Sequence, residues 1–463
     1  MSITGDHPHG GNNSGAPPDG SLRTSSHSSP GRDAGLVRAV GPWALAAAIV
    51  NAVVGGGIFS LPSAMNAAAG NLASLAFLLC ALAMGAVVLC FAEAGARVAS
   101  SGGAYAVAEE AFGPLAAFLT GLMLWVSAVL ACGGIAAAMA DGLAAWLPRF
   151  AQPHAGMIRV TLIVGVIGGL AALNIRGVAP AARAIGLLTL VKLVPLFLLV
   201  VVGSGWLLST GEAPSTPIGP PAHFGDALIL ALFAFSGMET PLGASGEVTR
   251  PERTIPRALF IAMGGVSLLY IAIQWVCEGL LGGALAGSQA PLSDAMARIG
   301  PAWGALLLLG ASISRLVWIG SDLLGAPRFL HAFAHDGTMP AILGRLHLVS
   351  RAPWIAILVH AAIAIALAMT GTFETLAILS ALVTAPLYLL VCVAAWRLRR
   401  RGVAHNGPVA GMPLLPVASV IGTASMLAIF ALARARDVAG LAILIAVGIL
   451  WYYVARQARS PER

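Results

Sequence analysis

The sequence predicts an all-α membrane protein of twelve transmembrane helices, and three observations support this fold class. Of its 463 residues, 58% are hydrophobic and only 10% are charged, which leaves too little polar surface to cover a soluble domain of this size. Apolar runs long enough to cross roughly 30 Å of hydrocarbon recur along nearly the whole chain. Two of these runs are interrupted near their middle, by Gly55-Gly56-Gly57 and by Phe235-Ser236-Gly237. We therefore expect the first and sixth helices to be broken.

The apolar runs define the spans and divide the chain. Residues 1–38 are rich in Gly, Ser, Pro, His and Asn and are expected to form a disordered cytoplasmic tail. Residues 39–400 are predicted to form the core, and residues 401–463 to add two helices and a short tail. The expected spans are 42–68, 72–98, 115–141, 157–175, 181–207, 225–248, 257–281, 302–327, 353–371, 374–396, 411–433 and 438–455.

The basic residues support this layout and its orientation. Of the 26 lysines and arginines, 19 fall on the side of the two termini and 5 on the other side, while Lys192 and Arg315 lie within spans. Because cytoplasmic loops are enriched in basic residues, both termini are predicted to be cytoplasmic, in a cell inner membrane. The net charge of +7 thus indicates orientation in the bilayer, and no nucleic-acid partner is expected.

The sequence shows no motif that is typical of an enzyme or a metal site. All five cysteines lie within apolar spans without paired spacing, so they are read as buried hydrophobic residues and not as disulfides or metal ligands. The sequence has no phosphate-binding glycine loop, no nucleophile elbow and no clustered set of metal ligands. We therefore expect no enzyme activity, cofactor or metal. Glu93, near the end of the second span, is expected to be solvated.

A faint internal repeat accompanies the paired breaks. The second and seventh spans are each followed by a short amphipathic stretch that ends in Gly-Pro, at 104–114 and at 291–301. The first stretch is predicted on the cytoplasmic side and the second outside, as two five-helix units of opposite topology would place them. Two ordinary Gly-Pro helix starts are the alternative.

Four elements are predicted to meet at the middle of the bilayer. Lys192, Arg315 and both breaks lie about 12 or 13 residues into their spans, which at about 1.5 Å per residue is near the bilayer centre. The half-helix that begins near Ile58 would offer free N–H groups to a carboxylate, and the one that ends near Phe235 would offer carbonyl groups to an ammonium. A zwitterion such as an α-amino acid fits both ends. The alternative is that the glycines only allow close helix packing.

These residues resemble the amino acid–polyamine–organocation (APC) superfamily of permeases over roughly residues 40 to 400. The resemblance is carried by Gly55-Gly56-Gly57-Ile58-Phe59, Ser101-Gly102-Gly103-Ala104-Tyr105, Phe235-Ser236-Gly237-Met238-Glu239, Ser245-Gly246-Glu247-Val248, Pro251-Glu252-Arg253-Thr254-Ile255-Pro256-Arg257, Gly325-Ala326-Pro327-Arg328 and Asp336-Gly337. It implies a LeuT-type fold, with 5+5 inverted repeats and two further C-terminal helices.

The resemblance also implies roles for individual residues. Gly55, Gly56 and Gly57, with Ile58 beside them, match the loop that binds the substrate carboxylate. Phe233 matches an aromatic side chain that covers the substrate in some relatives. Phe235, Ser236 and Gly237 match the stretch that binds its amino group.

Two charged residues are implied to couple or gate transport. Lys192 matches a fifth-span lysine that stands where other relatives bind sodium, and burial of its ammonium would favour release of a proton. Snorkelling to the interface is the alternative. Glu239 matches an acidic residue linked to gating and proton sensing, although it could simply cap a half-helix.

Three further polar residues are expected to support or tune the site. Arg315 departs from the family pattern; we expect it to pair with Asp322 or Glu239, or else to recognise an acidic substrate side chain. Asn51, one turn before the glycines, is expected to satisfy freed backbone groups.

The sequence thus predicts an amino acid permease that works by alternating access, coupled to protons and independent of sodium. The alternative within the class is an exchanger or exporter of amino acids or amines. A channel or a transporter-like sensor is a rival of another class, but no ring of pore-lining groups and no output domain is evident. Neutral, acidic and amine substrates all remain open.

Overall fold

The computed structural model describes residues 38–98, 100–145, 154–177, 181–211, 223–405 and 408–457. Within these ranges the regular structure is helical, apart from an isolated bridge between Val40 and Val248. The predicted disordered tail lies outside the described residues, except for Arg38. The all-α class is thus confirmed.

The α-helices are, in chain order, α1 (Pro42–Val53), α2 (Leu61–Ala69), α3 (Ala73–Arg97), α4 (Ala104–Phe112), α5 (Pro114–Ala145), α6 (Ala155–Arg176), α7 (Ala181–Thr210), α8 (Phe224–Phe235), α9 (Pro251–Leu281), α10 (Pro291–Ala297), α11 (Pro301–Gly325), α12 (Pro327–His335), α13 (Trp354–Thr370), α14 (Phe373–Arg400), α15 (Leu415–Leu432) and α16 (Ala435–Gln457). Short 3₁₀ turns join several of them, including η1 (Gly57–Phe59) and η4 (Pro241–Glu247).

The lengths of these helices fit a protein that crosses the membrane many times. Among the described residues, nine helical stretches are long and apolar enough to span a bilayer, and three shorter apolar helices accompany them. Two of the shorter helices are α1 and α8, which belong to the predicted broken spans. Each of the twelve predicted ranges contains helix, and the stretches predicted at 104–114 and 291–301 form α4 and α10.

The outer surface of the bundle is apolar. Large hydrophobic side chains in the middle of the long helices are exposed, among them Leu82, Val201, Leu268 and Leu309. In water these side chains would be unfavourable, whereas in a bilayer they face lipid tails. The five cysteines are all buried and free, as predicted.

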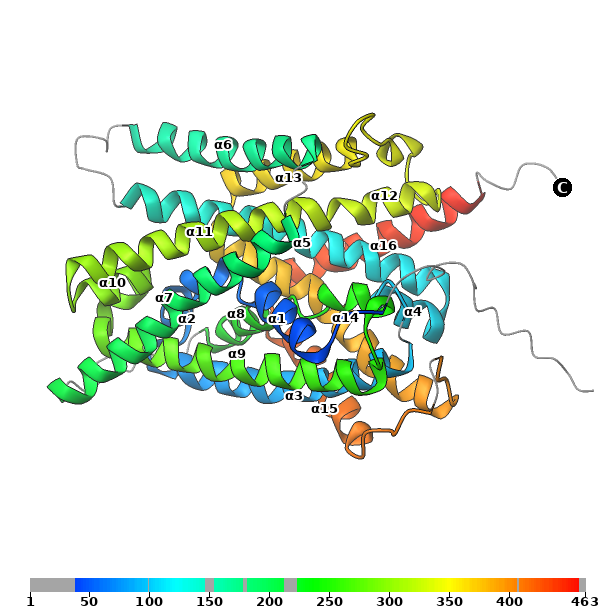
Figure 1. Ribbon diagram of the computed structural model, residues 1–463, viewed down its shortest axis with the longest axis horizontal. Helices are drawn as coiled ribbons and strands as arrows, with labels where there is room; N and C mark the ends of the chain where they lie inside the picture. The colour runs from blue at the N-terminus through cyan, green and yellow to red at the C-terminus, as the bar shows by residue number, and fades with distance from the viewer. Residues whose placement is uncertain are drawn as a thin grey trace, which may run out of the picture.

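The interrupted helices lie inside the bundle. Figure 1 shows α1, α2 and α8 in its middle, with α6 and α13 along one side and α3 and α9 along the opposite side. The chain just before α1 pairs with the chain that follows η4, since the Val40 amide donates to the Glu247 carbonyl (3.0 Å) and the Thr249 amide donates to the Val40 carbonyl (3.0 Å). The two broken segments are therefore tied together by their backbones.

Glu93 corrects one expectation, because it is buried and not solvated. Only 1% of the residue is exposed, and its carboxylate lies 2.8 Å from a guanidinium nitrogen of Arg97 one turn later. The amide of Met412 donates to the same carboxylate (2.8 Å), and Arg97 donates to the carbonyl of Val403 (3.0 Å). The segment after α14 thus folds back over the end of α3 and excludes water, which the position of Glu93 near a span end did not indicate.

This buried pair predicts a large effect of a single substitution. Glu93→Ala leaves Arg97 charged and buried without its partner, so we expect a loss of about 3 kcal/mol of stability. Thermal unfolding of the purified protein in detergent measures it. Glu374→Ala, on an exposed carboxylate in the first turn of α14, is the control and should change the melting temperature little. Equal melting temperatures for the two variants would contradict the structural role of Glu93.

Candidate functional site

The first break separates α1 from α2. The α-helix ends at Val53, η1 turns through Gly57–Phe59, and helix resumes at Leu61. Side chains from other helices lie directly against the three glycines. A Cβ on Gly55 would lie 2.7 Å from the indole of Trp318, one on Gly56 would lie 2.6 Å from Cγ of Arg315, and one on Gly57 would lie 2.7 Å from the ring of Phe233. Side chains here would therefore displace their neighbours, so the glycines serve close packing as well as the break.

The second break follows α8. After Phe235 the chain turns at Ser236, and Gly237 has φ +109°, a conformation that residues with a Cβ rarely adopt. Ser236 donates to the Phe233 carbonyl through both its amide (3.2 Å) and its hydroxyl (2.7 Å). The Gly237 amide donates to the carboxylate of Glu239 (3.1 Å). Polar groups of the same turn therefore satisfy backbone groups that this break leaves free.

The end of α1 is held by donors from three other helices. The last carbonyl groups of a helix have no partner within it, and in an apolar interior each needs one. Lys192 on α7 donates to the Asn51 carbonyl (2.6 Å), Trp318 on α11 to the Ala52 carbonyl (3.4 Å) and Tyr270 on α9 to the Val53 carbonyl (2.9 Å). Lys192 is 1% exposed. Its ammonium thus lies against the first break, as the sequence predicted for its depth.

Glu239 is held by a residue that the sequence analysis missed. The hydroxyl of Tyr388 on α14 donates to its carboxylate (2.7 Å), and both side chains are buried. Tyr270 and Trp318 were missed in the same way. Their signal is a polar aromatic residue in mid-span, but such residues also occur elsewhere in the chain, so spacing alone does not select them.

Arg315 lies at the first break. Contrary to the expectation, it does not pair with Asp322 or Glu239. It is 2% exposed and donates to the Gly56 carbonyl (3.4 Å), the Ala138 carbonyl (3.4 Å) and the Ser60 hydroxyl (2.7 Å). Asp322 lies seven residues further along α11, about 10.5 Å away by helical rise, and is not among these partners. Asp322 instead meets the imidazole of His360 on α13 (2.9 Å). Both predicted pairings, with Asp322 and with Glu239, are therefore wrong.

The predicted residues divide into two groups in space. Gly55, Gly56, Gly57, Ile58, Phe233, Phe235, Ser236, Gly237 and Glu239 form the two breaks, with Lys192 and Arg315 against the first of them. Asp322 lies apart, facing α13. The side-chain Oδ1 of Asn51 has no hydrogen-bond partner among the described residues, so this oxygen accepts from no freed backbone amide there.

A cavity of about 230 Å³ lies where α2 and α8 meet the first turns of α14 and α16. Apolar residues of α2, α8 and α14 line it, together with polar and charged side chains near the helix ends. The lining residues are Ala64, Ala67, Ala68, His223, Asp226, Leu230, Glu374, Thr375, Ile378, Arg434, Arg436 and Asp437. Leu230 is one turn before Phe233, whose ring contacts the ring of Phe373 edge-on (centroids 5.9 Å apart). Phe233 thus lies between Gly57 and the helices that line this cavity.

An apolar outer surface, many membrane-spanning helices and two helices broken inside the bundle are typical of a membrane transporter and not of an enzyme. Comparison with known proteins agrees. The family described as "Amino acid permease" matches residues 40–454, so the chain belongs to that family.

The relatives are transporters of similar length. The serine/threonine exchanger SteT of Bacillus subtilis is 26% identical over 444 residues, which cover 93% of this chain and 99% of the relative. The branched-chain amino acid permease BcaP of the same organism is 24% identical, covering 83% of this chain and 86% of the relative. An uncharacterized transporter of Mycobacterium bovis is 31% identical, covering 89% and 91%.

The second break predicts a position-specific effect of adding a methyl group. Gly237→Ala forces a Cβ into a backbone conformation with φ +109° and places it 3.1 Å from the Ala52 carbonyl. We expect a loss of about 1–3 kcal/mol of stability, measured by thermal unfolding. Gly85→Ala, inside α3 with open space around its Cβ, is the matched control and should not destabilise the protein. If Gly237→Ala unfolds at the temperature of the control, the left-handed turn after α8 is wrong.

Proposed function

We propose that this protein is a secondary active transporter of amino acids that works by alternating access in a cell inner membrane, with both termini cytoplasmic. Ten of its twelve spans would form a LeuT-type core at residues 39–400, and the other two would be the added helices in residues 401–463. Two features support this architecture. The first and sixth predicted spans are the interrupted ones, and α4 and α10 occupy corresponding places before α5 and α11.

One observation carries the coupling proposal: the ammonium of Lys192 donates to the Asn51 carbonyl at the end of α1 (2.6 Å). A freed carbonyl in an apolar interior needs a cation or a donor, and here the protein supplies both in one side chain. A charged amine holds this carbonyl more strongly than a neutral one, because charge-assisted hydrogen bonds are stronger. Loss of the proton would therefore loosen α1 from α7. This links protonation to the position of the first half-helix without sodium.

The substrate that fits best is a neutral amino acid. Besides Lys192, Arg315 and Glu239 carry charges at the breaks, but both already bond to groups of the protein, to Ser60 and to Tyr388 respectively. Neither is therefore left to balance a charged substrate side chain. The zwitterion's own charges match the two half-helix ends. The names of SteT and BcaP, a serine/threonine exchanger and a branched-chain amino acid permease, support the same class.

In the conformation described, the ring of Phe233 lies against Gly57, in the loop whose amides the substrate carboxylate would use. Binding therefore requires Phe233 to move, either toward the cavity near α14 or with the end of α8. This fits the role of an aromatic cover over the substrate. Exchange of one amino acid for another is the second candidate, favoured by the similarity to SteT over 93% of this chain.

Transport in liposomes separates the two candidates. For a proton symporter we expect uptake of serine, threonine or a branched-chain amino acid to be driven by an inward proton gradient and unchanged by a sodium gradient. An exchanger would instead show counterflow that needs amino acid inside and is indifferent to the proton gradient. Uptake driven by sodium would exclude the proposed role of Lys192, while leaving the amino acid as substrate.

The lysine itself provides the sharper test. Lys192→Met removes the charge and the donor to Asn51 but keeps much of the volume, so we expect at least about a tenfold loss of proton-driven accumulation. Substrate binding, measured by calorimetry, should fall less. Arg345→Met, on an exposed arginine, is the control for loss of one positive charge. Retention of proton-driven accumulation in Lys192→Met would contradict the coupling role.

A further inference from the structure

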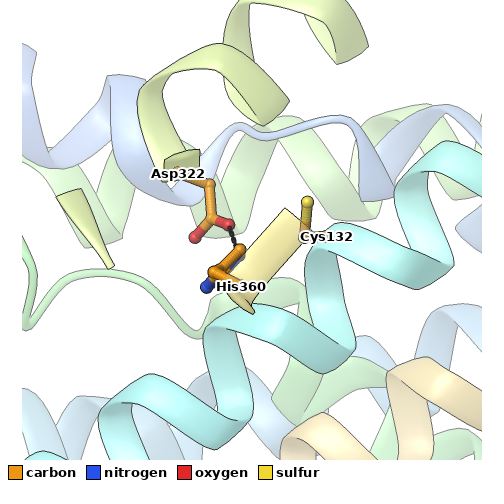
Figure 2. A group of neighbouring side chains, drawn as sticks. All are labelled: Cys132, Asp322 and His360. Carbon is orange, nitrogen blue, oxygen red and sulfur yellow. Dashed lines mark hydrogen bonds and ion pairs between the residues drawn. The ribbon is translucent and has the colours of Figure 1, made fainter. Parts of the chain in front are cut away.

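A second cluster of polar side chains lies outside the breaks. Cys132 on α5, Asp322 on α11 and His360 on α13 lie beside one another, and their ligand atoms are all within 4.8 Å of one another (Figure 2). Nε2 of His360 is 2.9 Å from Oδ2 of Asp322. These positions are far apart in the sequence, so they form no recognisable metal-ligand motif.

The surroundings of this cluster are apolar. Cys132 and His360 are fully buried, and Cys132 belongs to a hydrophobic cluster that includes Ile135, Ile319 and Leu323. Among the described residues, Nδ1 of His360 has no hydrogen-bond partner. Burying an imidazole and a carboxylate away from water is costly unless each is paired, and here each faces the other.

We propose that Cys132, Asp322 and His360 bind a thiophilic divalent cation of the Zn²⁺ type. Thiolate, imidazole and carboxylate are the ligands that Zn²⁺ takes, and three protein ligands leave a fourth tetrahedral position for water. Usual zinc bond lengths put neighbouring ligand atoms about 3.3–3.6 Å apart. The Asp322–His360 contact of 2.9 Å therefore has to open by only a few tenths of an ångström. Sγ of Cys132 lies within 4.8 Å of both other ligand atoms, so it has to approach them by no more than about 1.2 Å.

The charges also favour this ion. On coordination the thiol of Cys132 gives up its proton to water, and the imidazole binds in its neutral form. One thiolate and one carboxylate then balance the two positive charges, so the loaded site is neutral within its apolar surroundings. Mg²⁺ and Ca²⁺ require six or more oxygen ligands, which this site does not offer.

Occupancy would fasten α5, α11 and α13 to one another, because each contributes one ligand. The site thus acts as a structural clamp that stabilises this side of the bundle. It is separate from the residues proposed for transport. Asp322, which was expected near the substrate, is a metal ligand in this proposal.

The test uses the full chain without a polyhistidine tag, with Co²⁺ as the probe. Cobalt bound to a thiolate shows a charge-transfer band in the near ultraviolet, which ligation by histidines alone does not produce. We expect this band at one cobalt per chain, displaced by Zn²⁺, and lost in Cys132→Ser. Cys80→Ser, on a buried cysteine of α3, is the matched control and should keep the band.

A second measurement separates failed folding from failed binding. Zn²⁺ should raise the melting temperature of the unchanged protein and of Cys80→Ser, whereas Mg²⁺ should not. In His360→Gln we expect the apparent Zn²⁺ affinity to fall at least about tenfold while the protein remains folded without metal. Absence of the cobalt band, or its persistence in Cys132→Ser, would overturn the proposal and leave the cluster as a hydrogen-bonded tie between α11 and α13.

Discussion

The structure depends on one constraint: backbone groups freed by a broken helix cannot stay unpaired in an apolar interior. The end of α1 meets this constraint with side chains from three other helices. Lys192, Tyr270 and Trp318 each take one of the last carbonyl groups. The break is thus held by a set of contacts around it and not by its own sequence. Any movement of α1 must exchange these contacts for others.

The second break meets the same constraint locally. Ser236 and Glu239 bond to the backbone of their own turn, and Tyr388 secures Glu239 from α14. The two breaks also touch, because Gly237 lies close to the Ala52 carbonyl. A shift at one break would therefore have to be accommodated at the other.

The buried charges follow a common rule, although the sequence suggested a different one. Lys192 was expected to stand where relatives bind sodium, and Arg315 to pair with Asp322 or Glu239 or to recognise an acidic substrate side chain. Both instead donate to backbone carbonyl groups at the first break. Carbonyls at a helix end carry partial negative charge, so they can stabilise a cation without a second ionised group. The carboxylate of Glu239 instead accepts hydrogen bonds from the Tyr388 hydroxyl and the Gly237 amide.

The sequence by itself determined the helical membrane class, the positions of the helices and both breaks, because hydrophobic run length and glycine content are local properties. It also placed Lys192 and Arg315 level with the first break, since position along a span follows from counting along a helix. Only the tertiary structure decided which side chains meet. Tyr270 and Tyr388 reach the breaks, Asp322 turns to His360 and away from Arg315, and Glu93 is covered by a returning loop. Such contacts depend on how each helix is rotated and on which helices surround it. A span that is apolar on all sides does not show either property in its hydrophobicity pattern.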